Sequence, residues 1–154
     1  MHEIEIRAAR FDSPEATRLV TAALADLGAR YGGNGDDTPV RASEFVPPTG
    51  DFLIAHLAGE AVGCGGWRGH DARVAELKRM FVMPTARGRG VARALLAAVE
   101  RSARNAGRER IILECGDKQP EAIALYESSG YRRIENFGYY RDWDGCVSFG
   151  RALT

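Results

Sequence analysis

The stretch from Glu76 to Leu96 constrains the fold of this chain more than any other. An apolar, partly β-branched run stops at Pro84, which predicts a strand. Apolar residues then recur at helical spacing from Val91, which predicts a helix. Between the two lie glycines and arginines: Arg87, Gly88, Arg89, Gly90 and, one turn later, Arg93. The sequence therefore predicts a strand, a tight glycine turn and a helix.

This turn is suited to an anion. A helix N-terminus has N–H groups without intrahelical partners and a partial positive charge. Gly88 and Gly90 lack the Cβ atoms that would keep a phosphate away, and the arginines add full charges. The stretch fits neither the Walker nor the dinucleotide pattern, because Gly90 is followed by Val91. A solvated, arginine-rich helix start explains the same residues without a ligand, and both interpretations stay open.

Composition limits the classes of protein to consider. With 154 residues, the chain fits one domain over 1–154. Its formal charge is zero, which argues against a nucleic-acid or anionic membrane partner. No apolar signal core and no apolar run of about 18 residues occur, so we expect a cytoplasmic protein. The three cysteines and three histidines show no ligand-like spacing, so we expect neither a disulfide framework nor a metal site.

Periodicity and turn residues predict the remaining elements. We expect strands over 3–9, 52–58, 61–67, 74–82, 110–115, 131–137 and 146–153. We expect helices from Asp12 or Ser13 to Gly28, over 88–106, and from Asp117 or Gln119 to Gly130, with a short turn at 40–45. The order β-α-(α)-β-β-β-α-β-α-β-β predicts an α/β protein, with helices on both faces of a mixed sheet.

Two loops are open to two interpretations each. Residues 28–39 are rich in glycine and aspartate, so they form either a flexible connection or a mobile flap over the acceptor site, with Tyr31, Asp36 and Asp37 available to a cationic substrate. Tyr139, Tyr140 and Trp143 belong to an aromatic patch before the last strand. Such a patch is typical of an acceptor pocket or of a dimer surface.

Three motifs together resemble the GNAT acetyltransferase superfamily. The pattern Arg87-x-x-Gly90-x-Ala92 after a strand resembles its pyrophosphate-binding signature. The strand 75–82 before this turn and the segment 119–131 after it resemble the family as well. The resemblance covers nearly the whole chain. It implies the acyl-CoA N-acyltransferase fold, with a central sheet that splays open.

The resemblance also implies acetyl-CoA as the cofactor. Its pyrophosphate would bind the turn beside Arg87, on the N–H groups of Gly88, Arg89, Gly90, Val91 and Ala92. Its pantetheine arm would lie along Met80, Phe81 and Val82. The chain departs from the family at Gln119, where an asparagine that reaches the pantetheine is usual.

The reaction that the resemblance implies is attack of an amine on the thioester. A neutral amine is required, so a base or an ordered water must take a proton. Glu76 resembles the glutamate that acts as base in the histone-acetylating branch, although a strand-entry residue paired with Lys78 explains it equally. Tyr126 occupies the position of the general-acid tyrosine, where a packed helix aromatic is the alternative.

The sequence therefore predicts an acetyl-CoA-dependent N-acetyltransferase acting on a primary amine of a small molecule, such as an amino acid or amine metabolite. Two alternatives stay open. One is a non-catalytic acyl-CoA sensor or partner-binding domain, and the other is an acetyltransferase of a protein lysine or aminoacyl-tRNA. The family implies a possible homodimer.

Overall fold

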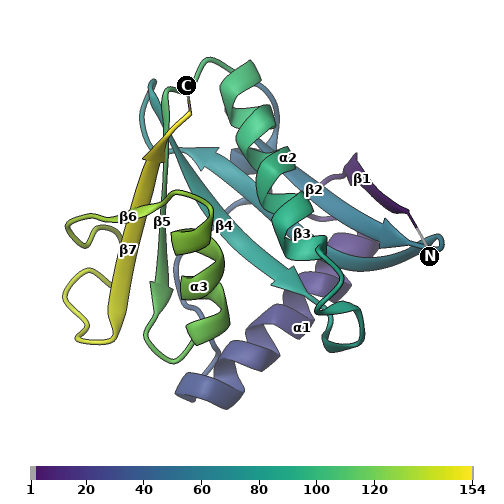
Figure 1. Cartoon of the computed structure of the whole chain (residues 1–154), viewed down its shortest axis with the longest axis horizontal. Coiled ribbons are helices and arrows are strands. Elements are labelled where there is room, and N and C mark those ends of the chain that lie inside the picture. Colours follow the sequence, from purple (N-terminus) through teal and green to yellow (C-terminus); the bar gives the residue numbers. More distant parts are fainter. Residues whose placement is uncertain (1–2, 154) are drawn as a thin grey trace.

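The computed structural model describes residues 3–153, and its elements follow the predicted order (Figure 1). The helices are α1 (Pro14–Tyr31), α2 (Val91–Asn105) and α3 (Pro120–Ser128), with short 3₁₀ turns η1 (Ala42–Phe45) and η2 (Pro84–Ala86). The strands are β1 (Ile4–Ala8), β2 (Gly50–Leu57), β3 (Glu60–Gly69), β4 (Val74–Val82), β5 (Arg110–Gly116), β6 (Arg132–Arg133) and β7 (Cys146–Ala152).

The strands form one seven-stranded sheet in the order β1-β2-β3-β4-β5-β7-β6, and only the β4–β5 pair is parallel. Alternating side chains of β2 enter two cores. Leu53 and Ala55 pack in the core under α2 and α3, whereas Phe52 and Ile54 pack in the core under α1 and η1 (Figure 1). The predicted mixed α/β sheet with helices on both faces is confirmed.

The centre of the sheet opens between β4 and β5. Their pairing ends at Glu76–Ile112, although β4 continues for six more residues. On the other side of β4, one residue of β3, Gly65, faces both Arg79 and Met80 in a β-bulge. Arg79 has a φ of 59°, so the strand bends at this point. The predicted splay therefore exists, and the glycines of β3 make room for the bulge.

The starts of α1 and α2 follow from capping and glycine geometry. Ser13, one of the two predicted caps, accepts the N–H of Ala16 at 3.3 Å. Helix α2 begins at Val91, three residues later than predicted. Gly88 and Gly90 have φ values of 77° and 84°, which are left-handed and cannot continue a right-handed helix.

Helix α1 is one turn longer than predicted, since it ends at Tyr31 and not at Gly28. Gly32, with a φ of 84°, closes the helix by donating its N–H to the Gly28 carbonyl at 2.7 Å. A Cβ on Gly28 would lie 3.1 Å from the carbonyl oxygen of Gly33. Glycine at position 28 therefore admits the returning loop and does not stop the helix. As a result, Tyr31 is held on the last helical turn.

The strand predicted over 131–137 is wrong in its length. Only Arg132–Arg133 pairs with β7 as a strand. Farther along, the Asn136 side chain donates to the Cys146 carbonyl at 3.1 Å, so a side chain replaces the backbone ladder. Residues 137–145 are consequently a loop, and this loop reaches the opening between β4 and β5.

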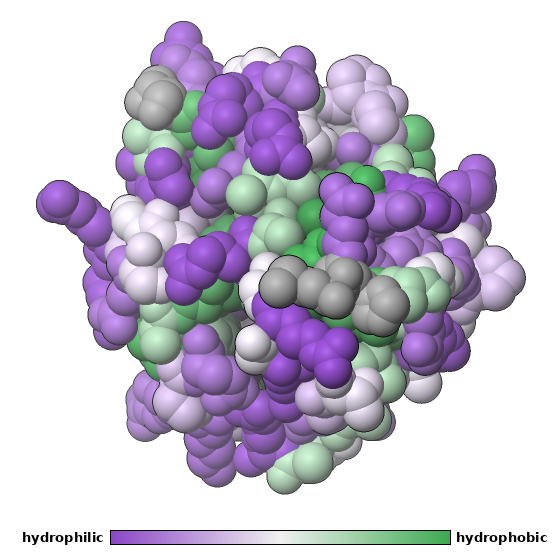
Figure 2. Space-filling view, turned by 45° about the vertical axis from the view of Figure 1, so that its right-hand side comes forward, coloured by the Kyte–Doolittle hydropathy of each residue, from purple (hydrophilic) through white to green (hydrophobic). Residues whose placement is uncertain are grey.

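The face of the molecule in Figure 2 is mainly hydrophilic, with hydrophobic residues showing among the polar ones near its middle. Within residues 3–153, the large hydrophobic side chains that are exposed are Val46, Tyr139 and Trp143. Two of these three belong to the 137–145 loop. No helix in the described part of the chain is long and apolar enough to cross a membrane.

Candidate active site

The turn before α2 presents a row of free backbone donors. The N–H groups from Gly88 to Arg93 have no hydrogen-bond acceptor within residues 3–153, and Ala94 is the first that bonds back, to the Gly90 carbonyl at 3.0 Å. A Cβ on Gly88 or Gly90 would meet no protein atom within 4 Å, so the space beside the turn is open. Together with the positive end of the helix dipole, these donors fit a diphosphate.

The three arginines of this turn have different surroundings. Arg87 donates through Nε to the Val82 carbonyl at 3.0 Å, and its guanidinium lies 5.7 Å from the centre of the Phe81 ring. Arg93 donates to two serine hydroxyls at the end of α3, at 3.1 and 3.3 Å. Arg89 is exposed. The turn thus keeps its positive charge next to the free N–H groups, while Arg87 also holds the end of β4.

A cavity of about 420 Å³ lies where β4 and β5 separate. Six of the predicted site residues line it: Tyr31, Met80, Phe81, Gln119, Tyr126 and Tyr140. They come from α1, β4, α3 and the 137–145 loop, so the cavity brings together segments from most of the chain. Its volume is within the range of small-molecule sites, roughly 300–1,000 Å³.

Tyr126 is buried in the wall of this cavity, with 5% of its surface exposed. Its ring packs against Tyr131 and Phe149, with centroids 5.7 and 6.1 Å away. Its hydroxyl has no hydrogen-bond partner within residues 3–153. Burial raises the pKa of this phenol, so it carries its proton at neutral pH. Tyr126 can therefore donate a proton to a group inside the cavity.

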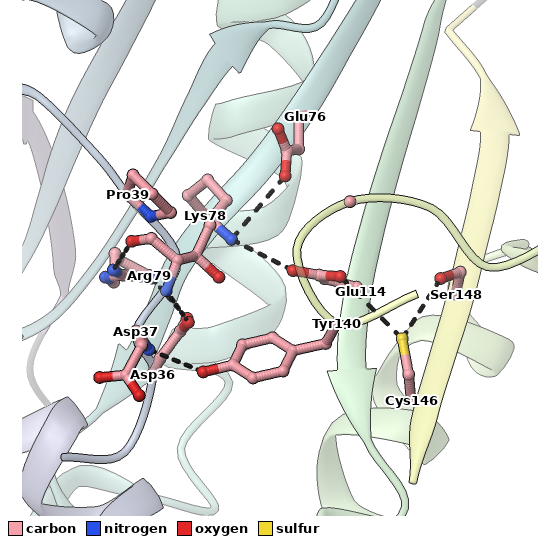
Figure 3. A network of polar contacts seen from close by, with 12 residues as sticks. Asp36, Asp37, Pro39, Glu76, Lys78, Arg79, Glu114, Tyr140, Cys146 and Ser148 are labelled. Atoms are coloured by element: carbon pink, nitrogen blue, oxygen red, sulfur yellow. Dashed lines mark hydrogen bonds and ion pairs between the residues drawn. The ribbon is translucent and has the colours of Figure 1, made fainter. Parts of the chain in front are cut away.

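Lys78 is buried between two glutamates, one on its own strand and one on β5 (Figure 3). Its Nζ lies 3.7 Å from Glu76 Oε2 and 3.6 Å from Glu114 Oε1. Glu76 is also bound by Arg68 at 3.0 Å. Glu114 lines the cavity, whereas Glu76 does not. The predicted base is thus separated from the cavity by Lys78, and its catalytic role stays a prediction.

Burial raises the pKa of Glu114 above its ordinary value. The positive charge of Lys78 opposes this shift, and the negative charges of Glu76 and Asp36 add to it. A carboxyl group with a raised pKa is a better proton acceptor than an exposed carboxylate. Glu114 is the residue that sequence analysis missed. A charged residue within the buried run 110–115 was the signal that could have found it.

A second ion pair closes the cavity on the α1 side. Arg79 donates to Asp36 at 2.5 Å and to the Thr38 carbonyl at 3.3 Å. Burial alone would raise the pKa of Asp36, but the charges of Arg79 and Lys78 keep it below its usual value. The 32–41 loop is therefore fixed to the bulge of β4. These contacts indicate that the 32–41 loop forms a wall of the cavity and is not a flexible connection.

The 137–145 loop meets this wall from the other side. The Tyr140 hydroxyl accepts the N–H of Asp37 at 2.7 Å, across 103 residues of sequence (Figure 3). Trp143 lines the cavity and packs edge-to-face on Tyr31, with centroids 5.4 Å apart. Tyr139 is exposed and does not line the cavity. Of the aromatic patch, Tyr140 and Trp143 thus line the cavity, whereas Tyr139 lies outside it.

Gln119 is tied to the end of β5. Its Oε1 accepts the N–H of Gly116 at 3.0 Å and the Tyr31 hydroxyl at 3.3 Å. The same Tyr31 oxygen accepts the N–H of Lys118 at 3.0 Å. The amide nitrogen of Gln119 has no hydrogen-bond partner within residues 3–153, while its oxygen orders the loop.

Comparisons with known proteins agree with this geometry. The model of the Acetyltransferase (GNAT) family matches residues 16–131. An IAA acetyltransferase of Azospirillum brasilense is 43% identical over 90 residues, which cover 58% of this chain and 59% of that protein. The chain thus matches less than two thirds of the length of this relative.

Solved structures extend the similarity to nearly the whole chain. A proposed acyl-CoA N-acyltransferase from Klebsiella pneumoniae has 30% identity and a TM-score of 0.81, with 98% of each chain covered. A GNAT family acetyltransferase from Elizabethkingia anophelis, solved with acetyl-CoA bound, has 17% identity and a TM-score of 0.70, with 97% of each chain covered. At 17% identity, the Elizabethkingia anophelis structure shows a shared fold.

Proposed function

The chain belongs to the acetyltransferase (GNAT) family, and on this premise we propose that it transfers acetyl from acetyl-CoA to a primary amine of a small molecule. The cavity between β4 and β5 carries this proposal. It contains a proton donor, Tyr126, and a carboxylate, Glu114, and its volume of about 420 Å³ suits a small acceptor beside the acetyl end of the cofactor.

Acetyl-CoA would be held by three parts of the chain. The diphosphate would bind the free N–H groups from Gly88 to Ala92, beside Arg87 and Arg89. The pantetheine arm would lie along Met80–Val82, where β4 has no β5 neighbour. Gln119 would offer its amide nitrogen to the same arm. The open space beside the glycines and the single-sided strand support this arrangement.

In the proposed reaction, the amine nitrogen attacks the thioester carbonyl carbon and the carbon–sulfur bond breaks. An ammonium ion must first lose a proton, and the nitrogen loses a second one as the acetyl group stays on it. Tyr126 would give its proton to the leaving sulfur and regain one from the nitrogen. Glu114 or Glu76 would take the first proton. Glu114 faces the cavity, while Glu76 would act through Lys78 or through water.

Thiol release from acetyl-CoA tests the function. We expect release with small primary amines and little with lysine peptides or aminoacyl-tRNA, because the cavity is lined by two loops tied together through Tyr140. Binding of acetyl-CoA without release for any acceptor would favour the sensor alternative. Release only with a macromolecular acceptor would favour the modifier alternative.

The homodimer stays a prediction, with exposed Tyr139 as a candidate contact.

Replacing both turn glycines tests the diphosphate site. Gly88→Ala with Gly90→Ala would add Cβ atoms in the open space beside the N–H groups. Loss of one charge-assisted hydrogen bond costs about 1.5–3 kcal/mol, so we expect affinity for acetyl-CoA to fall roughly ten- to hundred-fold by calorimetry. Gly107→Ala is the control, because Gly107 has a similar φ of 88° just beyond the other end of α2. If the wild type, the double variant and Gly107→Ala bind acetyl-CoA with equal affinity, the diphosphate binds elsewhere.

A further inference from the structure

Charged side chains alternate in sign from the surface at η1 to the cavity. Arg68 lies 3.1 Å from Glu44 and 3.0 Å from Glu76. Lys78 then lies 3.7 Å from Glu76 and 3.6 Å from Glu114. Glu76, Lys78 and Glu114 are at most 7% exposed as side chains. The row therefore runs carboxylate, cation, carboxylate, cation, carboxylate, and Glu114 is its last member.

This row has one more carboxylate than cations. The neighbouring pair of Asp36 and Arg79 is balanced and does not change the difference. The excess negative charge lies at Glu114, which shares its one cation, Lys78, with Glu76. A buried charge without a full partner is unfavourable. Glu114 is thus one cation short, and Asp37, which also lines the cavity and has no ion pair within residues 3–153, adds further negative charge to this wall.

We propose that the acceptor's ammonium group is this missing cation, and that the acceptor is a cationic amine with an apolar body and no carboxylate. The inference rests on the proposed acetyl transfer and narrows its substrate class. The Tyr126 hydroxyl, which lacks a partner within residues 3–153 and lines the same cavity, independently indicates that a ligand completes this site.

A carboxylate on the acceptor would find no free cation in this cavity. Lys78 and Arg79 are the cations that line it within the described residues. Lys78 is shared by two glutamates, and Arg79 uses its terminal nitrogens on Asp36 and the Thr38 carbonyl. Only the buried Nε of Arg79 lacks a partner. An acceptor carboxylate would therefore have to displace Asp36 or face the excess charge at Glu114.

The apolar body of the acceptor would lie against an aromatic wall. Tyr31, Tyr140 and Trp143 all line the cavity. Trp143 is edge-to-face with both tyrosines, at centroid distances of 5.4 and 6.2 Å. Aromatic faces also attract an ammonium group directly. An arylalkylamine or alkylamine fits this combination better than an amino acid does.

Matched acceptors that differ in a carboxylate test the inference. We expect kcat/KM for thiol release to be at least about ten-fold higher for phenethylamine than for phenylalanine, and for cadaverine than for lysine. Equal or higher values for the amino acids would overturn the inference and leave acetyl transfer intact. Absence of release with every amine would instead contradict the proposed function.

Glu114→Gln separates recognition from chemistry. Amine affinity is measured by calorimetry on protein saturated with coenzyme A, where no acetyl group can be transferred. We expect phenethylamine to bind about ten-fold more weakly to this variant, with little change for an uncharged analogue such as phenethyl alcohol. Glu109→Gln is the control, because Glu109 lies just before β5 and is exposed. Unchanged amine affinity in Glu114→Gln would overturn the assignment.

Discussion

Tyr126→Phe is expected to lower kcat by roughly 10²- to 10⁴-fold, the usual contribution of one general acid or base. The hydroxyl lies in the cavity wall and has no partner within residues 3–153, so its removal leaves no protein group unsatisfied. We therefore expect the free energy of unfolding to change by less than about 1 kcal/mol. Affinity for acetyl-CoA should also be retained. Single-turnover thiol release and a thermal melt measure the two effects separately.

Tyr131→Phe is the matched control for this variant. Its ring packs against Tyr126, but its hydroxyl donates to Glu100 at 2.7 Å, within the core. Removing a hydrogen bond to a buried charged group costs about 1.5–3 kcal/mol of stability. We expect this variant to melt earlier and to keep its turnover. The opposite pattern, with loss of turnover in Tyr131→Phe alone, would remove Tyr126 from the proposed mechanism.

The order of the elements could be predicted because its signals are local. The strand Val74–Val82 has the predicted bounds, since a polar turn precedes it and Pro84 follows it. The glycine turn before α2 was likewise predictable from residues within one short stretch. Gly28 was misinterpreted because its role depends on the carbonyl of Gly33, which returns only after the helix has ended.

The charges of the candidate site could not be predicted in the same way. Lys78 and Glu114 are 36 residues apart and meet only because β4 and β5 lie side by side in the sheet. Tyr140 and Asp37 are farther apart still. A family motif indicated Tyr126 and the phosphate turn, but no local pattern indicates which carboxylate faces the cavity. For that reason the sequence indicated Glu76 but not Glu114, which is the glutamate that lines the cavity.

Lys78→Met should be the most destabilising single change at the site. Methionine keeps the apolar stem, but Glu114 loses its cation and Glu76 keeps only Arg68. Breaking a buried ion pair from one side costs roughly 3–5 kcal/mol. For a chain of this size, about 2–4 °C of melting temperature is lost per kcal/mol, so we expect a decrease of about 6–20 °C. Lys118→Met, which removes an exposed cation near the cavity, should change little.

The loss in Lys78→Met should depend on pH in a defined direction. Glu114 already has a raised pKa, with Glu76, Asp36 and the Cys146 thiol also near it, and removal of Lys78 raises this pKa further. An acid whose pKa is higher in the folded than in the unfolded state destabilises the fold above that pKa and loses this penalty as the pH falls through it. We therefore expect the difference from the wild type to shrink in acid.

Lys78→Met with Glu114→Gln should recover part of the loss at neutral pH, because the unpaired charge is gone. A deficit that is the same at every pH, and that the second substitution does not relieve, would mean that Lys78 stabilises the fold by packing and that the alternating charges do not determine the electrostatics of the cavity.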